Sequence, residues 1–298
     1  MPAPTVSIAH AALRGFLTAA CAMACAAAGM LGGCGEGEAE RAASAPAARA
    51  AAGAPRIVSL SPAITQTLAD LGAGSLVVGR TPWCSAVDPA VPVVGSLEDA
   101  DLERIAAVEP TLVCVQHAQV PPQLAELARR RGFEVRAWHL DRLADVERLV
   151  QELGAVLVQQ GCAPAAERAQ ALLQAHAQAL QPPAPLQAPV LLLFSVDPPG
   201  AFGAQTYVDE LWCALGGRNA VAGRGYPAMS AEDVAALHPA AAVVFARAPV
   251  PAWLERAAAG HVVAIEAPEL LQPDTRMLVQ GPAALRRAAQ ALADGGAR

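Results

Sequence analysis

The chain has 298 residues, which is enough for two domains of ordinary size, each with its own core. Its 27 acidic and 21 basic residues give a net charge of −6, whereas nucleic-acid binding requires a clustered basic surface. Every basic residue is an arginine, which excludes a P-loop lysine, a Schiff-base lysine and a lysine general base. We therefore expect no nucleic-acid partner and no lysine-dependent chemistry.

Residues 1–33 have the pattern of an export signal. Arg14 precedes an apolar run at 16–31 that is short for a membrane span, and small residues lie directly before Cys34. This ending resembles the lipobox of bacterial lipoproteins, in which the cysteine becomes the lipidated N-terminus. We predict a signal peptide at 1–33, a lipid on Cys34 and a periplasmic or other extracytoplasmic location. A plain secretory signal and an uncleaved anchor are the alternatives.

After the cysteine, a tether leads into alternating strands and helices. Residues 34–54 are small, polar and aperiodic, as in a flexible tether. The alternation at 55–163 predicts an N-terminal lobe with an open, mostly parallel sheet. The expected strands are 56–60, 76–79, 93–94, 112–115 and 133–138, and the expected helices are 62–71, 103–109, 123–131 and 143–159.

A helix without a strand partner follows at 164–182, where good helix formers continue without an internal glycine or proline. We interpret it as a stiff bridge to a C-terminal lobe at 183–298, which repeats the alternation. The expected fold is α/β, with two Rossmann-like lobes joined by a single long backbone helix. In the second lobe we expect strands at 190–194, 242–245 and 262–265, helices at 207–215, 232–238 and 253–259, and a closing helix at 277–292 that Pro282 interrupts.

One stretch occurs twice. Residues 103–110 and 232–239 share the pattern Glu-x-(Ile/Val)-Ala-Ala-(Val/Leu)-x-Pro, and each is followed by an apolar run. Each copy predicts a short helix that ends at a proline and then a buried strand. The repeat therefore places Glu103 and Glu232 at equivalent positions of the two lobes. A carboxylate in a first helical turn is also favoured by the helix dipole alone.

Five residues are candidates for a ligand site. Trp83 lies in a proline-rich loop after a strand, and Tyr226 lies just before the second repeat helix. Gln116 and His117 follow the strand at 112–115, at the edge where open α/β sheets bind ligands. Phe202 is a candidate for the opposite wall, since ligand pockets are commonly lined by aromatic side chains. The alternatives are internal packing for the aromatic rings and an ordinary loop histidine.

Cysteine and histidine spacing indicates no metal site. Cys114 and Cys213 lie in apolar patterns and are expected to be buried. The spacing does not decide whether Cys84 and Cys162 are free or paired. We also find no G-x-S-x-G, H-E-x-x-H or P-loop motif, so we expect no catalytic residues and no enzyme activity.

Several stretches, taken in order, resemble the helical-backbone class of periplasmic substrate-binding proteins, which serve importers of cobalamin, haem and ferric siderophores. They are IVSLSPAIT at 57–65, LGAG at 71–74, FSVDPP at 194–199, ELW at 210–212 and both repeat units. The resemblance covers residues 56–294. It implies a ligand in a cleft between the lobes, and a glutamate of each lobe, here Glu103 and Glu232, docked onto arginines of the membrane permease.

The resemblance is closest to the cobalamin-binding members, with three departures. One is the segment at 268–272, which lacks the polar contacts that the resemblance would imply. Gln66 stands where the family usually has a glutamate, and Leu97 stands where an aromatic residue would face the corrin. We therefore predict a monomeric binding protein that carries no cofactor of its own and delivers a corrinoid or other metal chelate to an ABC importer permease. A haem or ferric-siderophore binding protein, an importer-independent sensor and a chelatase-like protein are the alternatives.

Overall fold

The computed structural model describes residues 54–181, 188–246 and 249–295 of the chain. From Ala52 onward the chain forms one compact unit. The predicted signal peptide at 1–33, the lipidation site Cys34 and all but the last residue of the predicted tether lie outside the described residues. No helix within the described part is long and apolar enough to cross a membrane.

The first half of the described chain builds a parallel sheet in the order β2-β1-β3-β4. In place of the strand expected at 93–94, Val93 forms a single bridge to Arg80. A short 3₁₀ helix, η1 (Gly74–Leu76), leads into the second strand. The strands are β1 (Ile57–Ser59), β2 (Val77–Arg80), β3 (Leu112–Val115) and β4 (Glu134–Ala137).

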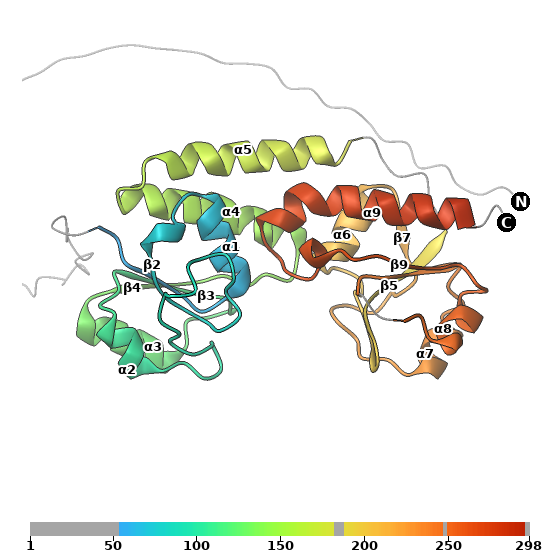
Figure 1. Ribbon diagram of the computed structural model, residues 1–298, viewed down its shortest axis with the longest axis horizontal. Helices are drawn as coiled ribbons and strands as arrows, with labels where there is room; N and C mark the ends of the chain where they lie inside the picture. Colours follow the sequence, from blue (N-terminus) through green and yellow to red (C-terminus); the bar gives the residue numbers. More distant parts are fainter. Residues whose placement is uncertain (1–53, 182–187, 247–248, 296–298) are drawn as a thin grey trace, which may run out of the picture. The chain divides into compact units, whose positions relative to one another are not determined.

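Helices cover both faces of this sheet, and the alternation of side chains along the strands accounts for this arrangement (Figure 1). Ile57 packs with α1 (Pro62–Asp70) and α4 (Leu143–Gln159) in one core. The next residue, Val58, packs with α2 (Leu102–Ala107) and α3 (Pro122–Arg131) in another. Successive strand residues point to opposite faces, so a strand covered on both faces is apolar throughout, as β3 is.

The second half builds a sheet in the order β6-β5-β8-β9, with β7 beside β5. Within the described part, β6 is the one antiparallel strand of this sheet. The short strands β6 and β7 were not predicted. The strands are β5 (Pro189–Val196), β6 (Pro199–Ala201), β7 (Arg218–Asn219), β8 (Ala241–Val244) and β9 (Val262–Ala264).

Helices again lie on both faces of the second sheet (Figure 1). The helices α6 (Tyr207–Ala214) and α9 (Thr275–Gly295) share one face, and α7 (Ala231–Ala236) and α8 (Ala252–Ala257) share the other. A 3₁₀ helix, η2 (Pro268–Leu270), precedes α9. The α/β prediction is confirmed.

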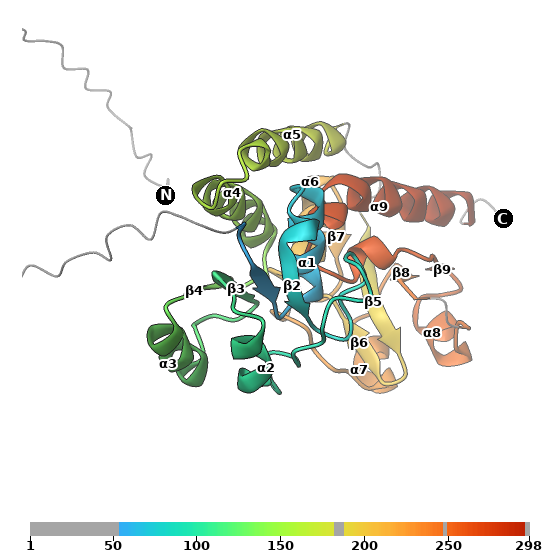
Figure 2. The ribbon, with the colours of Figure 1, turned by 60° about the vertical axis from the view of Figure 1, so that its left-hand side comes forward.

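The helix α5 (Pro164–Ala179) packs against α4 of the first half and α9 of the second half (Figures 1 and 2). It ends at Ala179, three residues before the expected end at 182. The same apolar core continues from α1 and α4 to α6 and α9. The two halves are therefore joined by packed helices as well as by the chain itself.

The closing helix α9 runs through Pro282, which corrects the expected interruption. Proline has no N–H and leaves the carbonyl four residues earlier, that of Leu278, without its helical donor. The imidazole Nδ1 of His176, in α5, lies 2.8 Å from this carbonyl oxygen and supplies the missing hydrogen bond. His176 is buried, and its Nε2 lies 3.4 Å from a carboxylate oxygen of Glu147 in α4.

The sequence repeat is also a repeat of backbone conformation. The residue before each repeat proline has a positive φ, 44° at Glu109 and 46° at His238, which is uncommon for a residue other than glycine. Each of these turns stops a six-residue helix and starts a buried strand, β3 or β8. The two units are thus matched residue by residue, from the N-cap of the helix to the end of the strand.

Candidate ligand-binding face and docking residues

Trp83 is presented to solvent by a tight turn at the carboxyl end of β2. The residues on either side of its turn, Thr81 and Cys84, are buried, and the Cys84 N–H donates to the Thr81 carbonyl at 3.2 Å. The Thr65 hydroxyl lies 2.9 Å from the Cys84 sulfur and ties this turn to α1. Because both flanks are fixed, the indole of Trp83, which is 66% exposed, is held outside the fold.

Gln116 and His117 lie at the same edge of the first sheet, just after β3. The Ser61 hydroxyl, at the N-cap of α1, donates to the Gln116 side-chain oxygen at 2.7 Å, so the amide NH₂ group is directed elsewhere. His117 is exposed, and its Nδ1 lies 2.8 Å from the carbonyl oxygen of Gln119 and 3.2 Å from its nitrogen. Nδ1 donates to the Gln119 carbonyl in one tautomer and accepts from the Gln119 N–H in the other, and Nε2 carries a lone pair only in the first.

The opposite half carries a cluster of aromatic rings. The ring of Phe202 lies 5.2 Å from that of Phe194, 5.8 Å from Tyr207, 6.0 Å from Tyr226 and 6.0 Å from Phe245, each in an edge-to-face arrangement. This geometry is favourable between aromatic quadrupoles. Phe202 is itself buried, with 2% of its surface exposed, and so lies beneath Tyr226, which is 41% exposed.

The loop that carries Tyr226 is paired with the chain just after β6. The N–H groups of Gly203 and Ala204 donate to the carbonyls of Gly225 and Gly223 at 2.8 and 2.7 Å. A Cβ on Gly203 would lie 2.3 Å from the Gly223 oxygen, so this approach of two backbones requires glycine. The loop therefore holds Tyr226 in one place over the aromatic cluster.

Both tyrosines of the cluster keep their phenolic protons. Burial, with smaller contributions from Tyr226, Asp274 and Asp141, raises the pKa of Tyr207, whose hydroxyl donates to the Leu270 carbonyl at 3.2 Å. Burial and the nearby carboxylates of Asp141 and Asp145 likewise raise the pKa of Tyr226. Tyr226 therefore offers a hydrogen-bond donor beside its exposed ring.

Polar contacts connect the two halves close to these tyrosines. Arg142 and the N–H of Leu143, at the start of α4, donate to the two carboxylate oxygens of Glu210 in α6 at 2.7 and 2.9 Å. The Tyr207 N–H donates to the Asp141 carbonyl at 2.7 Å. The segment at 141–143 therefore fixes where the first half meets the aromatic cluster of the second.

Of the five predicted ligand residues, Trp83, Gln116 and His117 share the carboxyl edge of the first sheet. Phe202 and Tyr226 contact one another on the second half. Tyr207 was not predicted, because the sequence pattern placed it only in a helix. No described group of three or more histidine, cysteine, aspartate or glutamate side chains is arranged to hold a metal ion.

The four cysteines of the described residues are free thiols. Cys84 and Cys114 are buried and Cys162 is half-buried. The prediction that Cys213 is buried is wrong: it is exposed, and its sulfur lies 3.9 Å from the Asp209 carboxylate, one helical turn earlier in α6. The neighbouring Trp212 takes the buried position of this turn instead.

Glu103 and Glu232 occupy the second residue of α2 and α7, and both are exposed. The N-caps of these helices are provided by other residues. Asp101 accepts from the Arg104 N–H at 2.9 Å, and Ser230 forms a capping box with Asp233.

The capping contacts leave both glutamates unused by the fold. Hydrogen bonds from Ser230 hold the pKa of Asp233 below its ordinary value, so that carboxylate is charged and already serves the helix start. Neither Glu103 nor Glu232 forms a hydrogen bond or an ion pair with another described residue. Within the described residues, each glutamate can therefore stabilise the fold only through its interaction with the dipole of its own helix.

Comparison with known proteins agrees with this architecture. A family model described as a periplasmic binding protein matches residues 57–259, which is more than half of the chain. The chain therefore belongs to the periplasmic binding protein family. Membership of this family indicates an extracytoplasmic binding protein.

Solved structures show the same fold. The periplasmic haem-binding protein BhuT, in complex with two haems, is 20% identical, with a TM-score of 0.65 over 80% of this chain and 100% of its own. The haem-binding protein RhuT from Roseiflexus sp. RS-1 is 24% identical, with a TM-score of 0.59 over 80% and 100%. The vitamin B12 binding protein BtuF of Vibrio cholerae is 21% identical, with a TM-score of 0.60 over 82% and 98%. None of the curated proteins compared with this sequence matches it.

Proposed function

We propose that the chain is a lipid-anchored, monomeric binding protein that captures a corrinoid or another metal chelate and delivers it to an ABC importer permease. The anchor would be Cys34, and the protein would have no catalytic residues and no cofactor of its own. Its lobes would be residues 55–163 and 183–298, with the bridging helix at 164–182 between them. Membership of the periplasmic binding protein family supports this assignment.

The ligand would lie between the exposed aromatic residues of the two halves. Trp83 offers a flat apolar surface from one side, and Tyr226, supported by Phe202, offers a ring and a donor from the other. Gln116 and His117 would bind polar groups of the chelate, and the Nε2 of His117 would accept from a donor or bind a metal in the tautomer whose Nδ1 donates to the Gln119 carbonyl. Haem and ferric siderophores are the alternative ligands, since BhuT and RhuT are haem-binding proteins.

Capture would involve only modest closure of the two halves. The helices α4, α5 and α9 pack against one another, and Arg142 and Glu210 join the halves directly. An interface of packed helices resists a wide hinge motion, because opening would expose the apolar core that runs through it. Release would therefore require docking onto the permease.

One observation carries the importer role. Glu103 and Glu232 occupy the same helical position in two matched units, and the fold uses neither of them for capping or pairing. Capping explains an acid near a helix start but does not require the same residue position in both halves. Exposed carboxylates that are free of internal partners can pair with arginines of a membrane partner and steer its approach.

The test is the double variant Glu103→Gln with Glu232→Gln, assayed for docking onto the reconstituted permease and for ligand uptake into proteoliposomes. We expect docking to weaken by at least 100-fold, about 3 kcal/mol, because two charge pairs across the interface are lost together. Ligand binding to the free protein should be unchanged.

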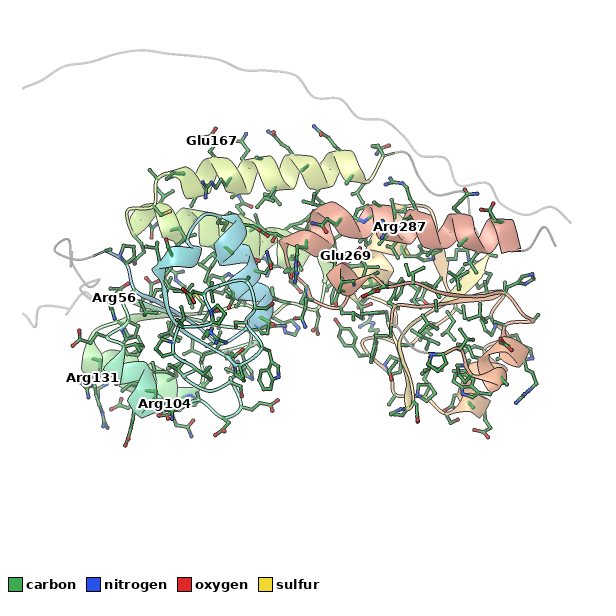
Figure 3. The ribbon with its side chains drawn as sticks, in the orientation of Figure 1. Arg56, Arg104, Arg131, Glu167, Glu269 and Arg287 are labelled. Carbon is green, nitrogen blue, oxygen red and sulfur yellow. The ribbon has the colours of Figure 1, made fainter. Side chains whose placement is uncertain are left out.

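A matched control removes two other first-turn glutamates, Glu167 of α5 and Glu255 of α8, both of which are exposed. Glu167 points away from α5 into solvent (Figure 3). The control variant Glu167→Gln with Glu255→Gln changes the net charge equally and should dock normally. Docking that survives the first double change would contradict the proposed role of Glu103 and Glu232. Failure of the unchanged protein to dock onto the permease would favour an importer-independent sensor.

A further inference from the structure

A recess of about 330 Å³ lies in the first half of the described chain. Its apolar part includes Leu60, which directly follows β1, and Leu124 in the first turn of α3, which follows β3. Leu97 and Leu102, from the loop before α2 and the first residue of α2, complete this apolar surface. The recess thus lies where neighbouring parallel strands end, which is the edge at which open α/β sheets bind ligands.

The rim of the recess is acidic and has a fixed shape. Glu98 and Asp99, both exposed, lie at the tip of a tight loop. The Ser96 N–H donates to the Asp99 carbonyl at 3.1 Å, and the Asp99 N–H donates to the Ser96 hydroxyl at 3.2 Å. Gly95 has a φ of 95°, and a Cβ there would lie 2.1 Å from the Asp99 oxygen, so this closed loop depends on glycine.

The charge at this rim is uncompensated. Within the described part of the chain, neither Glu98 nor Asp99 forms an ion pair, and none of the residues that line the recess is basic. The remaining polar residue of the lining is Gln123, which is neutral. Two neighbouring carboxylates attract hydrogen-bond donors and cations, and they repel a third carboxylate.

We propose that this recess is a subsite that receives a neutral or cationic, donor-bearing side arm of the transported ligand and discriminates against carboxylates. The inference rests on the proposed function. Ligand pockets commonly enclose about 300 to 1,000 Å³. At about 330 Å³ the recess lies at the small end of this range and suits a side arm of the ligand better than a whole macrocycle. Corrinoids carry peripheral amides that donate hydrogen bonds, whereas the propionates of haem would meet Glu98 and Asp99. The subsite therefore selects amide-bearing chelates.

Two matched ligand pairs test this selection on the full-length chain. One pair is cyanocobalamin and its derivative with one side-chain amide hydrolysed to a carboxylate. The other is haem and haem dimethyl ester. We expect the member without the free carboxylate, in whichever pair binds, to bind about fivefold more tightly at low salt, the scale of an exposed charge interaction, with a smaller preference at high salt.

The variant Glu98→Gln with Asp99→Asn should reduce the preference to about twofold or less, because these exposed, nearly isosteric changes remove the charge and keep the loop. The control Glu167→Gln with Glu255→Gln should keep the full preference. If the unchanged protein binds both members of a pair equally, the subsite proposal is wrong and the proposed function stands. The same conclusion follows if the variant keeps the full preference. Binding of none of the four ligands overturns the subsite and the corrinoid and haem assignments, and leaves ferric siderophores as the ligands of the proposed function.

Discussion

The unit α2–β3 of the first half and the unit α7–β8 of the second share one backbone and differ in the charges around it. In the first unit Glu103 is followed by Arg104, which forms a 3.0 Å ion pair with the N-cap Asp101. In the second unit Glu232 is followed by the acidic Asp233, and none of the described arginines forms an ion pair with the cap. The helix start is stabilised differently in each half while the glutamate is kept. The glutamate at the second helical position is therefore present whichever way the helix start is capped.

The halves also differ in the aromatic surface that they offer. The first presents a single indole, Trp83, on a fixed turn. The second presents Tyr226 above a cluster of rings and holds both tyrosines of the chain. A ligand bound between them would have an apolar surface on one side and an aromatic donor on the other.

Both aromatic surfaces are expected to contact the ligand, and this gives the largest effect predicted for a single substitution. The variants Trp83→Ala and Tyr226→Ala should each weaken ligand binding about 30-fold, or about 2 kcal/mol, because each removes a large exposed aromatic contact. Calorimetric titration measures both. Trp253→Phe, in α8, serves as the control and should bind normally. An effect confined to one of the two variants would place the ligand on one half only.

The second prediction concerns alkaline stability. The pKa of Tyr207 is raised above the ordinary value of about 10, so its stabilising contribution is complete below that pH and is lost as pH rises through the folded-state pKa. The free energy of unfolding should therefore fall above pH 10, by up to about 1.4 kcal/mol per pH unit for this phenol. The chain has no lysine, and arginines remain charged in this range.

Urea unfolding at pH 8, 10 and 11 of the unchanged protein and of Tyr207→Phe measures this effect. The variant loses one hydrogen bond and should be less stable at pH 8, but its stability should decline less steeply above pH 10. Burial also raises the pKa of the Cys114 thiol in β3, and this group titrates in both proteins, so the difference between their declines isolates Tyr207. Parallel declines of the two proteins would show that Tyr207 does not control the alkaline transition.

The third prediction concerns the contact between the halves at Pro282. His176→Leu leaves the Leu278 carbonyl without a donor in a buried site, whereas His176→Asn retains an N–H near the position of Nδ1. We expect the leucine variant to be less stable than the asparagine variant by about 1 kcal/mol. Chemical denaturation gives both values. Equal stabilities would mean that this hydrogen bond contributes nothing measurable.

The two repeat units should differ slightly in how much their glutamates contribute to permease docking, and this is the smallest effect that we predict. Arg104 reduces the negative potential around Glu103, whereas Asp233 increases it around Glu232. The single change Glu232→Gln should therefore weaken permease docking about twofold more than Glu103→Gln at low salt, and the two should converge at high salt. Association rates measured over a salt series give the comparison. A stronger effect of Glu103→Gln would contradict this electrostatic account.

The sequence was sufficient for the fold because its signals were local. The repeat, the caps Ser61, Asp101 and Ser230, and the apolar runs of β3 and β8 each specify an element within a few residues. The family resemblance drawn from the ordered motifs is confirmed by the family match.

The remaining features depend on contacts between segments far apart in the chain. Pro282 stays within α9 because a histidine more than 100 residues earlier supplies a donor. The strand β6 contains proline and glycine and forms only because β5 and the Tyr226 loop pair with it. The recess near Leu97 likewise joins two loops and a strand end that no local pattern connects.

The most direct measurement is a titration of the purified full-length protein with cyanocobalamin, haem and ferric siderophores, followed by tryptophan fluorescence and confirmed by calorimetry. Trp83 is exposed and should report a bound chromophore directly. We predict saturable one-to-one binding of one of these ligands with a dissociation constant in the micromolar range or tighter, about −8 kcal/mol or better. Fluorescence and heat that remain unchanged for every ligand would contradict the assignment of this chain as a metal-chelate binding protein.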